Sequence, residues 1–385
     1  TGLGKVRGSV VQGIQVFRGI PYASPPTGER RFRSPTPAPD WPDVLEATRF
    51  APECEQMHYG GVPRLAGSED CLHLNIYRPD TTETRLPVLF WIHGGGRTVG
   101  NARRVVTDLV RDEHVMVVTF GYRLAHMAKF AHPALSAEDT ERNASGNYGF
   151  EDAIEALRRV NRQISHFGGD PGRVTIAGLS GGGTMVCGLL LAPQAGGLFH
   201  GALIQSAGGC WFNTQPMAEQ ERTGERMARR MLCFGSDKAA CLRARPGWAF
   251  YLTGGSSVPT YGWPWQTAFY TAAPITGGAT GHTVDGYLFR QSWPQAFQAG
   301  TYNRVPTLVG TTEHEGRDVH AKLLIDLSGG EFEMGPEDFV DALEGFLGSR
   351  ELAARVAEER PLREDAGPAI EQYADLTTAA TATCP

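Results

Sequence analysis

Five short apolar runs, each bounded by turn-forming residues, constrain the fold of this chain more than any other feature. They have the length of strands, and they are too continuously apolar to alternate between a buried face and a solvent face. Strands have this composition when helices cover both faces of their sheet. The sequence therefore predicts an α/β fold with a mostly parallel, doubly wound central sheet. The predicted strands span residues 87–93, 115–122, 173–178, 201–206 and 306–311.

The segments between these runs indicate how the chain is organised. The clearest predicted helix spans residues 150–167, where apolar side chains from Ile154 to Phe167 recur at three- and four-residue steps. Segment 207–300 mixes Trp, Pro and Gly without a steady period, which is typical of a cap or gorge-lining insertion. We therefore expect one α/β domain over residues 1–385 that carries 207–300 as this insertion.

Charge and hydropathy exclude two classes of partner. The 385 residues include 36 basic and 42 acidic ones, which gives a formal net charge of -6. No block of Lys or Arg resembles a surface that follows a phosphate backbone, so we expect no nucleic acid partner. No apolar run approaches the roughly eighteen residues that a membrane helix needs, so we expect no membrane span.

Four of the seven cysteines flank short loops. Cys54 and Cys71 flank a loop with Gly and Pro, and Cys233 and Cys241 flank a short polar loop. Loops closed by disulfides on the protein surface have this appearance. If both pairs are bonded, the protein leaves the cytosol and is secreted or periplasmic.

The remaining cysteines suggest no metal chemistry. The chain contains neither a CxxC pair nor a Cys/His spacing suited to zinc, so we expect no metal and no cofactor. Cys187 lies in an apolar helical run and Cys210 follows an apolar strand. We expect both to be buried free thiols.

The third predicted strand leads into the clearest catalytic motif. Gly178-Leu179-Ser180-Gly181-Gly182 is a G-x-S-x-G motif, and an apolar helical run follows it. A sharp turn between strand and helix needs glycines, since a Cβ atom on either side of the serine would clash. Ser180 would then stand at the helix N-terminus, where backbone N–H groups stabilise negative charge. We interpret Ser180 as a nucleophile; the alternative is a plain glycine-rich turn.

A second glycine cluster follows the first predicted strand, as His93-Gly94-Gly95-Gly96. Consecutive glycines let backbone N–H groups point into a cavity, which an oxyanion hole requires. A phosphate-binding loop is the alternative, but the chain has no GxxxxGK[ST] motif and no GxGxxG in the first βα unit. We expect His93 to be a structural hydrogen-bonding residue of this loop and not a base.

Several further motifs resemble those of the type-B carboxylesterase and cholinesterase family and follow in its order. They lie at residues 17–23, 68–75, 146–149, 167–171, 205–206 and 310–316. The resemblance covers nearly the whole chain and implies an α/β-hydrolase fold. It also implies hydrolysis of small-molecule carboxylic esters.

The same resemblance implies roles for individual residues. Ser180 matches the nucleophile, Gly95, Gly96 and Gly181 match the oxyanion-hole donors, and Glu315 matches the acid of the catalytic triad. It implies two disulfides, Cys54–Cys71 and Cys233–Cys241, and two buried ion pairs, Arg31–Glu69 and Arg123–Asp152.

The histidine of the triad is the main departure from the family pattern. Family members place it many tens of residues after the acid, whereas only His320 follows Glu315 here, and it is too close. We expect the histidine to lie in a C-terminal part of the domain beyond this sequence. Within the chain, His282 and His314 are the alternatives for the base, and Glu313 is the local alternative for the acid.

Three residues bear on substrate binding. Arg97 follows the glycine cluster, where relatives usually place an aromatic residue. We expect a solvent-facing substitution; the alternative is a clamp for substrates that carry carboxylates. Trp211 and Phe212 lie in the predicted insertion and are candidates to line the pocket, although core packing explains them equally well.

Three functions are compatible with these motifs. The leading interpretation is a serine carboxylesterase that forms an acyl-enzyme on Ser180. The first alternative is an acyltransferase or cyclase that uses the same site. The second is a non-catalytic, cholinesterase-like binding module.

Overall fold

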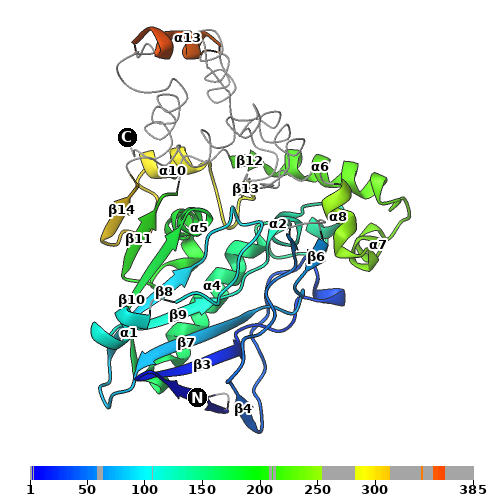
Figure 1. Ribbon diagram of the computed structural model, residues 1–385. Coiled ribbons are helices and arrows are strands. Elements are labelled where there is room, and N and C mark those ends of the chain that lie inside the picture. Colours follow the sequence, from blue (N-terminus) through cyan, green and yellow to red (C-terminus); the bar gives the residue numbers. More distant parts are fainter. Residues whose placement is uncertain are drawn as a thin grey trace, which may run out of the picture.

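A mixed eight-stranded sheet forms the centre of the molecule (Figure 1). The computed structural model describes residues 2, 4–58, 64–105, 107–207, 210, 214–253, 282–312, 340 and 350–359. The strand order across the sheet is β14-β11-β10-β8-β9-β7-β3-β2. In chain order these strands are β2 (Ser9–Val11), β3 (Ile14–Pro21), β7 (His73–Pro79), β8 (Leu86–Ile92), β9 (Met116–Phe120), β10 (Gly169–Leu179), β11 (Gly201–Gln205) and β14 (Thr307–Gly310).

The parallel part of the sheet consists of the five strands that the sequence predicts. Strand β10 pairs in parallel with both β8 and β11, β8 pairs in parallel with β9, and β11 pairs in parallel with β14. Every residue of β9 is buried, as the continuous apolar pattern predicts. Because parallel strands end at the same edge of a sheet, the loops that follow β8 and β10 meet there.

The sequence did not predict the antiparallel part of the sheet. Strand β7 pairs antiparallel with β9 and β3, and β2 continues the sheet beyond β3. Polar residues interrupt the apolar pattern of these strands, namely Arg18 in β3 and Asn75 and Arg78 in β7. The Asn75 side chain is nevertheless buried and donates to the Thr119 hydroxyl over 3.0 Å. The signal of a buried strand is therefore hidden by a polar group that is satisfied inside the protein.

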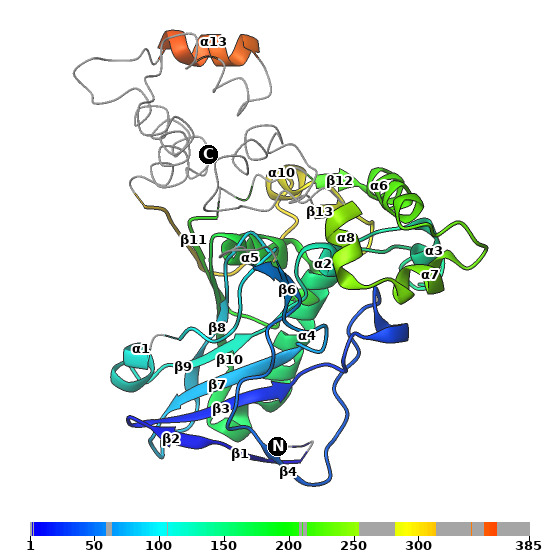
Figure 2. The same ribbon diagram turned by 45° about the vertical axis from the view of Figure 1, so that its right-hand side comes forward.

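Helices cover both faces of the sheet. Helices α4 (Tyr148–Gln163) and α5 (Gly181–Leu191) pack on one face, and α1 (Thr107–Asp112) lies on the other (Figures 1 and 2). The side chains of β8 divide accordingly: Phe90 belongs to the core that includes α4 and α5, and Leu89 packs against the cluster that includes α1. This confirms the prediction of a doubly wound α/β fold.

The described part of segment 207–300 contains helices that its irregular sequence did not predict. They are α6 (Met217–Arg230), α7 (Lys238–Ala244), α8 (Gly247–Thr253) and α10 (Trp293–Gln298). Helices α6 to α8 pack against α2 (Ala125–Lys129) and α3 (Pro133–Ser136) in a second apolar cluster. Only three residues of α6 are buried, so its apolar stripe is too narrow to recognise. The assignment of 207–300 as an insertion in one domain of residues 1–385 stays a prediction.

Ten further elements belong to the described chain. They are β1 (Lys5–Arg7), η1 (Gly28–Arg30), β4 (Val44–Glu46), β5 (Gln56–His58), β6 (Arg64–Ala66), η2 (Ile164–Phe167), η3 (Pro193–Ala195), β12 (Thr214–Pro216), β13 (His282–Val284) and α13 (Arg350–Glu359). None of the helices described here combines the length and the apolar character that crossing a bilayer requires.

Disulfides link the described residues at three places. Cys54–Cys71 and Cys233–Cys241 form as the sequence predicts. The prediction of free thiols at Cys187 and Cys210 was wrong, because these residues form a third disulfide with their Cα atoms 5.6 Å apart. Cys187 lies on α5, which packs on β10 and β11, and Cys210 follows β11. The fold thus brings together two cysteines that no short loop connects.

Both predicted ion pairs also form. The Arg123 guanidinium donates to both oxygens of the buried Asp152 carboxylate over 2.7 and 2.8 Å. Arg31 pairs with Glu69, with its Nε donating over 2.6 Å. The first pair ties the segment between β9 and α2 to α4, and the second anchors the loop before β7, since breaking a buried pair costs several kcal/mol.

Candidate active site

Ser180 occupies a strained turn between β10 and α5. Its φ of 55° and ψ of -122° lie outside the regions that L-residues usually adopt. The Ser180 N–H donates to the Gln205 carbonyl over 2.8 Å, and its carbonyl accepts from the Thr184 N–H over 3.0 Å. Neighbouring strand and helix therefore hold the turn in place, and Ser180 is exposed to solvent.

The glycines around Ser180 are needed because backbone segments approach each other closely. A Cβ atom on Gly182 would lie 2.1 Å from the Ile92 carbonyl oxygen, and one on Gly178 would lie 2.4 Å from the Gly182 carbonyl carbon. Real Cβ atoms do not tolerate such distances. The motif therefore lets α5 start directly against the end of β8.

The second glycine cluster lies beside this turn. A Cβ atom on Gly181 would lie 2.8 Å from the Gly96 nitrogen and 2.9 Å from the Arg97 nitrogen, and one on Gly94 would lie 3.4 Å from the Ser180 Cβ. The structure thus brings Ser180 and Gly181 together with the loop that contains Gly95 and Gly96. The backbone nitrogens of Gly96 and Arg97 therefore lie close to the residue that follows the serine.

The loop after β8 is held in a tight turn. The N–H groups of Thr98 and Val99 both donate to the Gly95 carbonyl over 3.0 Å. Gly95 has a φ of 105°, and a Cβ atom there would lie 2.2 Å from the Val99 carbonyl oxygen. Only glycine satisfies both conditions.

His93 is a structural hydrogen-bonding residue of this loop, as the sequence predicts. Its ring stacks on Tyr122 with 4.4 Å between the ring centroids, and the Tyr122 hydroxyl donates to the His93 carbonyl over 2.8 Å. Its Nδ1 lies 2.9 Å from the Gly94 carbonyl oxygen. Burial lowers the pKa of His93 to about 4, so the ring is uncharged at neutral pH.

Arg97 turns inward, so the expectation of a solvent-facing side chain was wrong. Its Nη1 lies 3.1 Å from Nδ1 of His282, and its Cζ lies 5.7 Å from the centre of the Phe150 ring. Both contacts come from elements distant in sequence, which is why the sequence could not indicate them. Burial lowers the pKa of Arg97 to about 10, so the guanidinium keeps its charge at neutral pH.

His282 lies in a buried aromatic cluster. Its ring stacks on Trp293 with 3.8 Å between the centroids, and Phe150 contacts its edge. Burial, and then the positive charges of Arg97 and Lys129, hold the pKa of His282 well below its usual range. The histidine therefore contacts Arg97 inside this cluster, and its alternative role as triad base stays a prediction.

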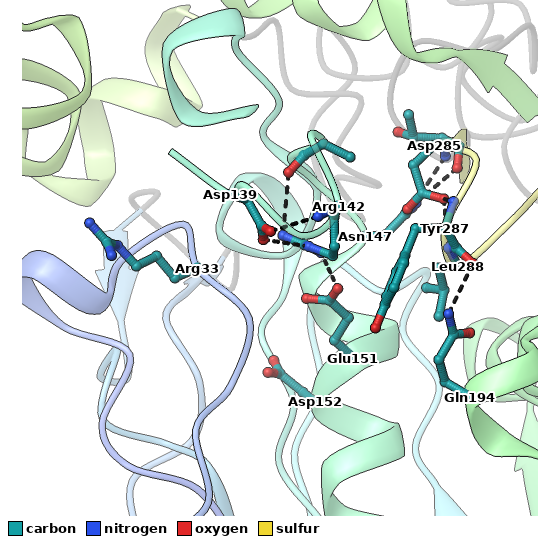
Figure 3. Close-up of polar contacts among 12 residues, drawn as sticks. Arg33, Asp139, Arg142, Asn147, Glu151, Asp152, Gln194, Asp285, Tyr287 and Leu288 are labelled. Atoms are coloured by element: carbon teal, nitrogen blue, oxygen red, sulfur yellow. Dashed lines mark hydrogen bonds and ion pairs between the residues drawn. The ribbon is translucent and has the colours of Figure 1, made fainter. Parts of the chain in front are cut away.

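A polar network fixes the strand that carries His282 (Figure 3). The Asn147 side chain donates to the Thr283 carbonyl over 2.8 Å and to the Asp285 carboxylate over 3.0 Å. The other Asp285 oxygen accepts from the N–H groups of Tyr287 and Leu288 over 3.0 and 2.8 Å. Asn147 stands directly before α4, so this network ties β13 to the same helix that carries Phe150.

Lys129, which the sequence did not indicate as a site residue, lines a cavity beside the glycine loop. Gly96, Arg97, Asn147, Phe150 and Lys129 contribute to its wall. Burial, and then the charge of Arg97, lower the pKa of Lys129 to about 7. The available signal was a lysine inside the apolar sequence Met127-Ala128-Lys129-Phe130-Ala131.

The remaining candidates lie outside the described residues. They are Trp211, Phe212, Glu313, His314, Glu315 and His320. Their predicted roles as pocket residues, triad acid and alternatives stay predictions.

Comparisons with known proteins agree on one family. Fumonisin B1 esterase of Sphingopyxis macrogoltabida is 37% identical over 314 residues, which cover 79% of this chain and 54% of that protein. Para-nitrobenzyl esterase of Bacillus subtilis (strain 168) is 41% identical over 215 residues, covering 54% of this chain and 42% of that protein. The chain thus spans about half the length of these relatives.

Solved structures give the same result for the fold. The Geobacillus stearothermophilus carboxylesterase EST55 superimposes with a TM-score of 0.77 at 30% identity, covering 98% of this chain and 72% of that one. Aspergillus niger EstA has a TM-score of 0.78 at 27% identity, covering 100% of this chain and 72% of that one. A family model described as "Carboxylesterase family" matches residues 1–385. The chain therefore belongs to the carboxylesterase family.

Proposed function

We propose that this protein is a serine carboxylesterase that hydrolyses small-molecule carboxylic esters through an acyl-enzyme on Ser180. The observation that carries the proposal is the strained turn at Ser180 beside the backbone N–H groups of a second glycine loop. Family membership supports it, because relatives of this chain are named as esterases.

The reaction would proceed in two steps. The Ser180 hydroxyl attacks the ester carbonyl carbon and loses its proton to a base, and the C–O bond to the alcohol breaks as the alcohol takes up a proton. The N–H groups of Gly95, Gly96 and Gly181 would bind the oxyanion of the tetrahedral intermediate. Water then attacks the acyl-enzyme and releases the carboxylic acid. Glu315 is the proposed triad acid, and a histidine is the expected base.

Two further expectations belong to this proposal. Trp211 and Phe212 would line the substrate pocket. The three disulfides support folding in an oxidising compartment, so we propose that the protein is secreted or periplasmic.

Turnover of p-nitrophenyl butanoate by the natural full-length protein tests the proposal. We expect Ser180→Ala to lower kcat by about 10⁴-fold or more, because the acyl-enzyme cannot form. The control Ser236→Ala removes an exposed hydroxyl and should leave kcat within twofold of the wild type. Equal activity of Ser180→Ala and wild type would refute the proposal; transfer of the acyl group to an added alcohol in preference to water would favour the acyltransferase alternative.

A further inference from the structure

Helix α4 carries a buried arginine, Arg159, with an exposed fraction of only 3%. Within the part of the chain that the structure describes, every other buried Arg, Asp or Glu takes part in an ion pair. These residues are Arg123, Glu151, Asp152, Glu155 and Arg243. Arg159 forms no ion pair and no side-chain hydrogen bond with any described residue. Buried charges in proteins normally have a partner of opposite sign, so Arg159 is an exception in this molecule.

The acidic residues around Arg159 balance only part of the positive charge there. Glu155 lies one turn earlier on α4, but its Oε1 accepts from Arg162 over 2.8 Å, and its Oε2 lies 3.7 Å from Nη1 of Arg158. Asp40 attracts Arg159 electrostatically without forming an ion pair with it, and Asp40 is exposed to solvent. Three arginines therefore share two carboxylates, one of which is in water.

An aromatic ring holds the Arg159 guanidinium in place. Its Cζ lies 5.2 Å from the centre of the Trp41 ring, and the Trp41 indole N–H donates to the Lys5 carbonyl over 2.9 Å. The face of the ring attracts the cation by about 0.5–2 kcal/mol. It offers no lone pair to the N–H groups of the guanidinium, so these donors stay available for an acceptor. Burial, and then the charge of Arg162, lower the pKa of Arg159 to about 10, so the guanidinium is charged at neutral pH.

Arg159 also lines a small cavity between α4, η2 and the strands β3 and β7. Gln163, which lies four residues later on the same face of the helix, is the other polar residue of its wall. The Oε1 atom of Gln163 accepts from the Gly2 N–H over 3.0 Å, so its amide nitrogen remains a donor. The other wall residues are Ile20, Leu74, Ile76, Val160, Ile164 and Phe167. A cationic donor and a neutral donor thus border one apolar cavity.

The size and the walls of this cavity select a small anion of single charge. The space is about that of one water molecule, which is too little for a carboxylate or a phosphate. Apolar walls cannot replace the hydration shell of a doubly charged ion, so entry of such an ion would cost more free energy. A chloride ion is close to water in size, and it accepts hydrogen bonds from any direction.

We propose that Arg159 and Gln163 form a binding site for one chloride ion between α4 and the strands β3 and β7. The ion neutralises the buried guanidinium and links the last turns of α4 to the sheet. The wall of this cavity shares no residue with the glycine loops or with the cavity beside them. The chloride site is therefore separate from the candidate active site, and it does not depend on the proposed esterase function.

Thermal unfolding of the full-length protein in sodium chloride and in sodium gluconate, at equal ionic strength, tests the site. An ion that binds only the folded protein raises its melting temperature. We expect the exchange of gluconate for chloride to raise the melting temperature of the wild type by about 2 °C more than that of Arg159→Met. The comparison between the two proteins removes the general effect of each salt on protein stability.

Further variants separate chloride binding from a structural effect. Arg158→Met removes the neighbouring arginine, whose side chain is 43% exposed, and should leave the response to chloride as in the wild type. Arg159→Lys keeps the positive charge and should retain part of the response. Arg159→Met removes a buried charge that has no ion-pair partner among the described residues, so in gluconate it should melt at or above the temperature of the wild type.

Crystals of the full-length protein grown with bromide in place of chloride locate the ion directly. We expect an anomalous scattering peak within hydrogen-bond distance of the Arg159 guanidinium, and no such peak in Arg159→Met. Equal responses of the wild type and Arg159→Met to chloride, or the absence of bromide at Arg159, would refute the site. Trp41 and Asp40 would then be sufficient to keep the guanidinium buried.

Discussion

Single glycines determine whether the backbone N–H groups beside Ser180 can point at the same oxygen atom. Gly95 has a φ of 105° and no space for a Cβ atom, since the Val99 carbonyl oxygen would lie 2.2 Å away. A Cβ atom on Gly181 would lie 2.8 Å from the Gly96 nitrogen and 2.9 Å from the Arg97 nitrogen. The geometry of the proposed oxyanion hole therefore depends on the absence of side chains at defined positions, which a sequence reveals directly as glycine.

Substitution of Gly95 tests this dependence. Gly95→Ala should displace the loop and lower kcat by about 10²-fold to 10³-fold, with a smaller change in KM, because an oxyanion donor acts on the transition state. Steady-state kinetics with p-nitrophenyl butanoate measure the change.

The matched control is Gly235→Ala, where an added Cβ atom would have no neighbour within 4 Å. It should leave both constants unchanged. An unchanged kcat in Gly95→Ala would exclude the loop from the catalytic step.

Other residues of the site could not be inferred from sequence in the same way. The position of Arg97 depends on its contact with His282, and the pKa of Lys129 depends on the charge of Arg97. These residues meet only after the chain has folded. A charged residue in an apolar segment is a weak signal, because long side chains often extend to solvent. Partners distant in sequence decide between these possibilities.

At the level of the elements, the β10–turn–α5 unit is joined to the region after β11 by the Cys187–Cys210 disulfide. The bond has a sequence separation of 23 residues, and the loop that it closes contains the end of α5, η3 and β11. It constrains the unfolded chain and holds α5 against the sheet.

Loss of this disulfide should destabilise the fold measurably. For the double variant Cys187→Ala/Cys210→Ala we expect a loss of about 3 kcal/mol in the free energy of unfolding, as the loop length predicts. Urea titration under non-reducing conditions measures it. The Cys233–Cys241 disulfide has a sequence separation of only 8 residues, so Cys233→Ala/Cys241→Ala should lose less free energy of unfolding. A larger loss in that variant would contradict the dependence on loop length.

The helices and strands differ in how completely their local sequences predict them. Strands β8, β9 and β11 and residues 174–179 of β10 are mostly apolar and lie next to glycines, so their local sequence is sufficient. Strand β7 contains the buried Asn75, and α6 buries only three residues, so both depend on partners supplied by the fold. The Cys187–Cys210 pair was missed for the same reason.

At the scale of the whole molecule, the central sheet carries two glycine loops at one edge. Strand β13, from the later part of the chain, reaches the same edge. Arg97 and His282 meet at this contact, and the network around Asn147 fixes it (Figure 3). In the proposed function, the loops at the edge of the sheet would supply the reacting groups.

Reaction of the natural full-length protein with an alkyl fluorophosphonate, followed by peptide mass spectrometry, tests whether Ser180 is the nucleophile. We expect one adduct per chain, on the peptide that contains Ser180, and none in Ser180→Ala. An adduct on a different residue, or equal labelling of Ser180→Ala and the wild type, would contradict it.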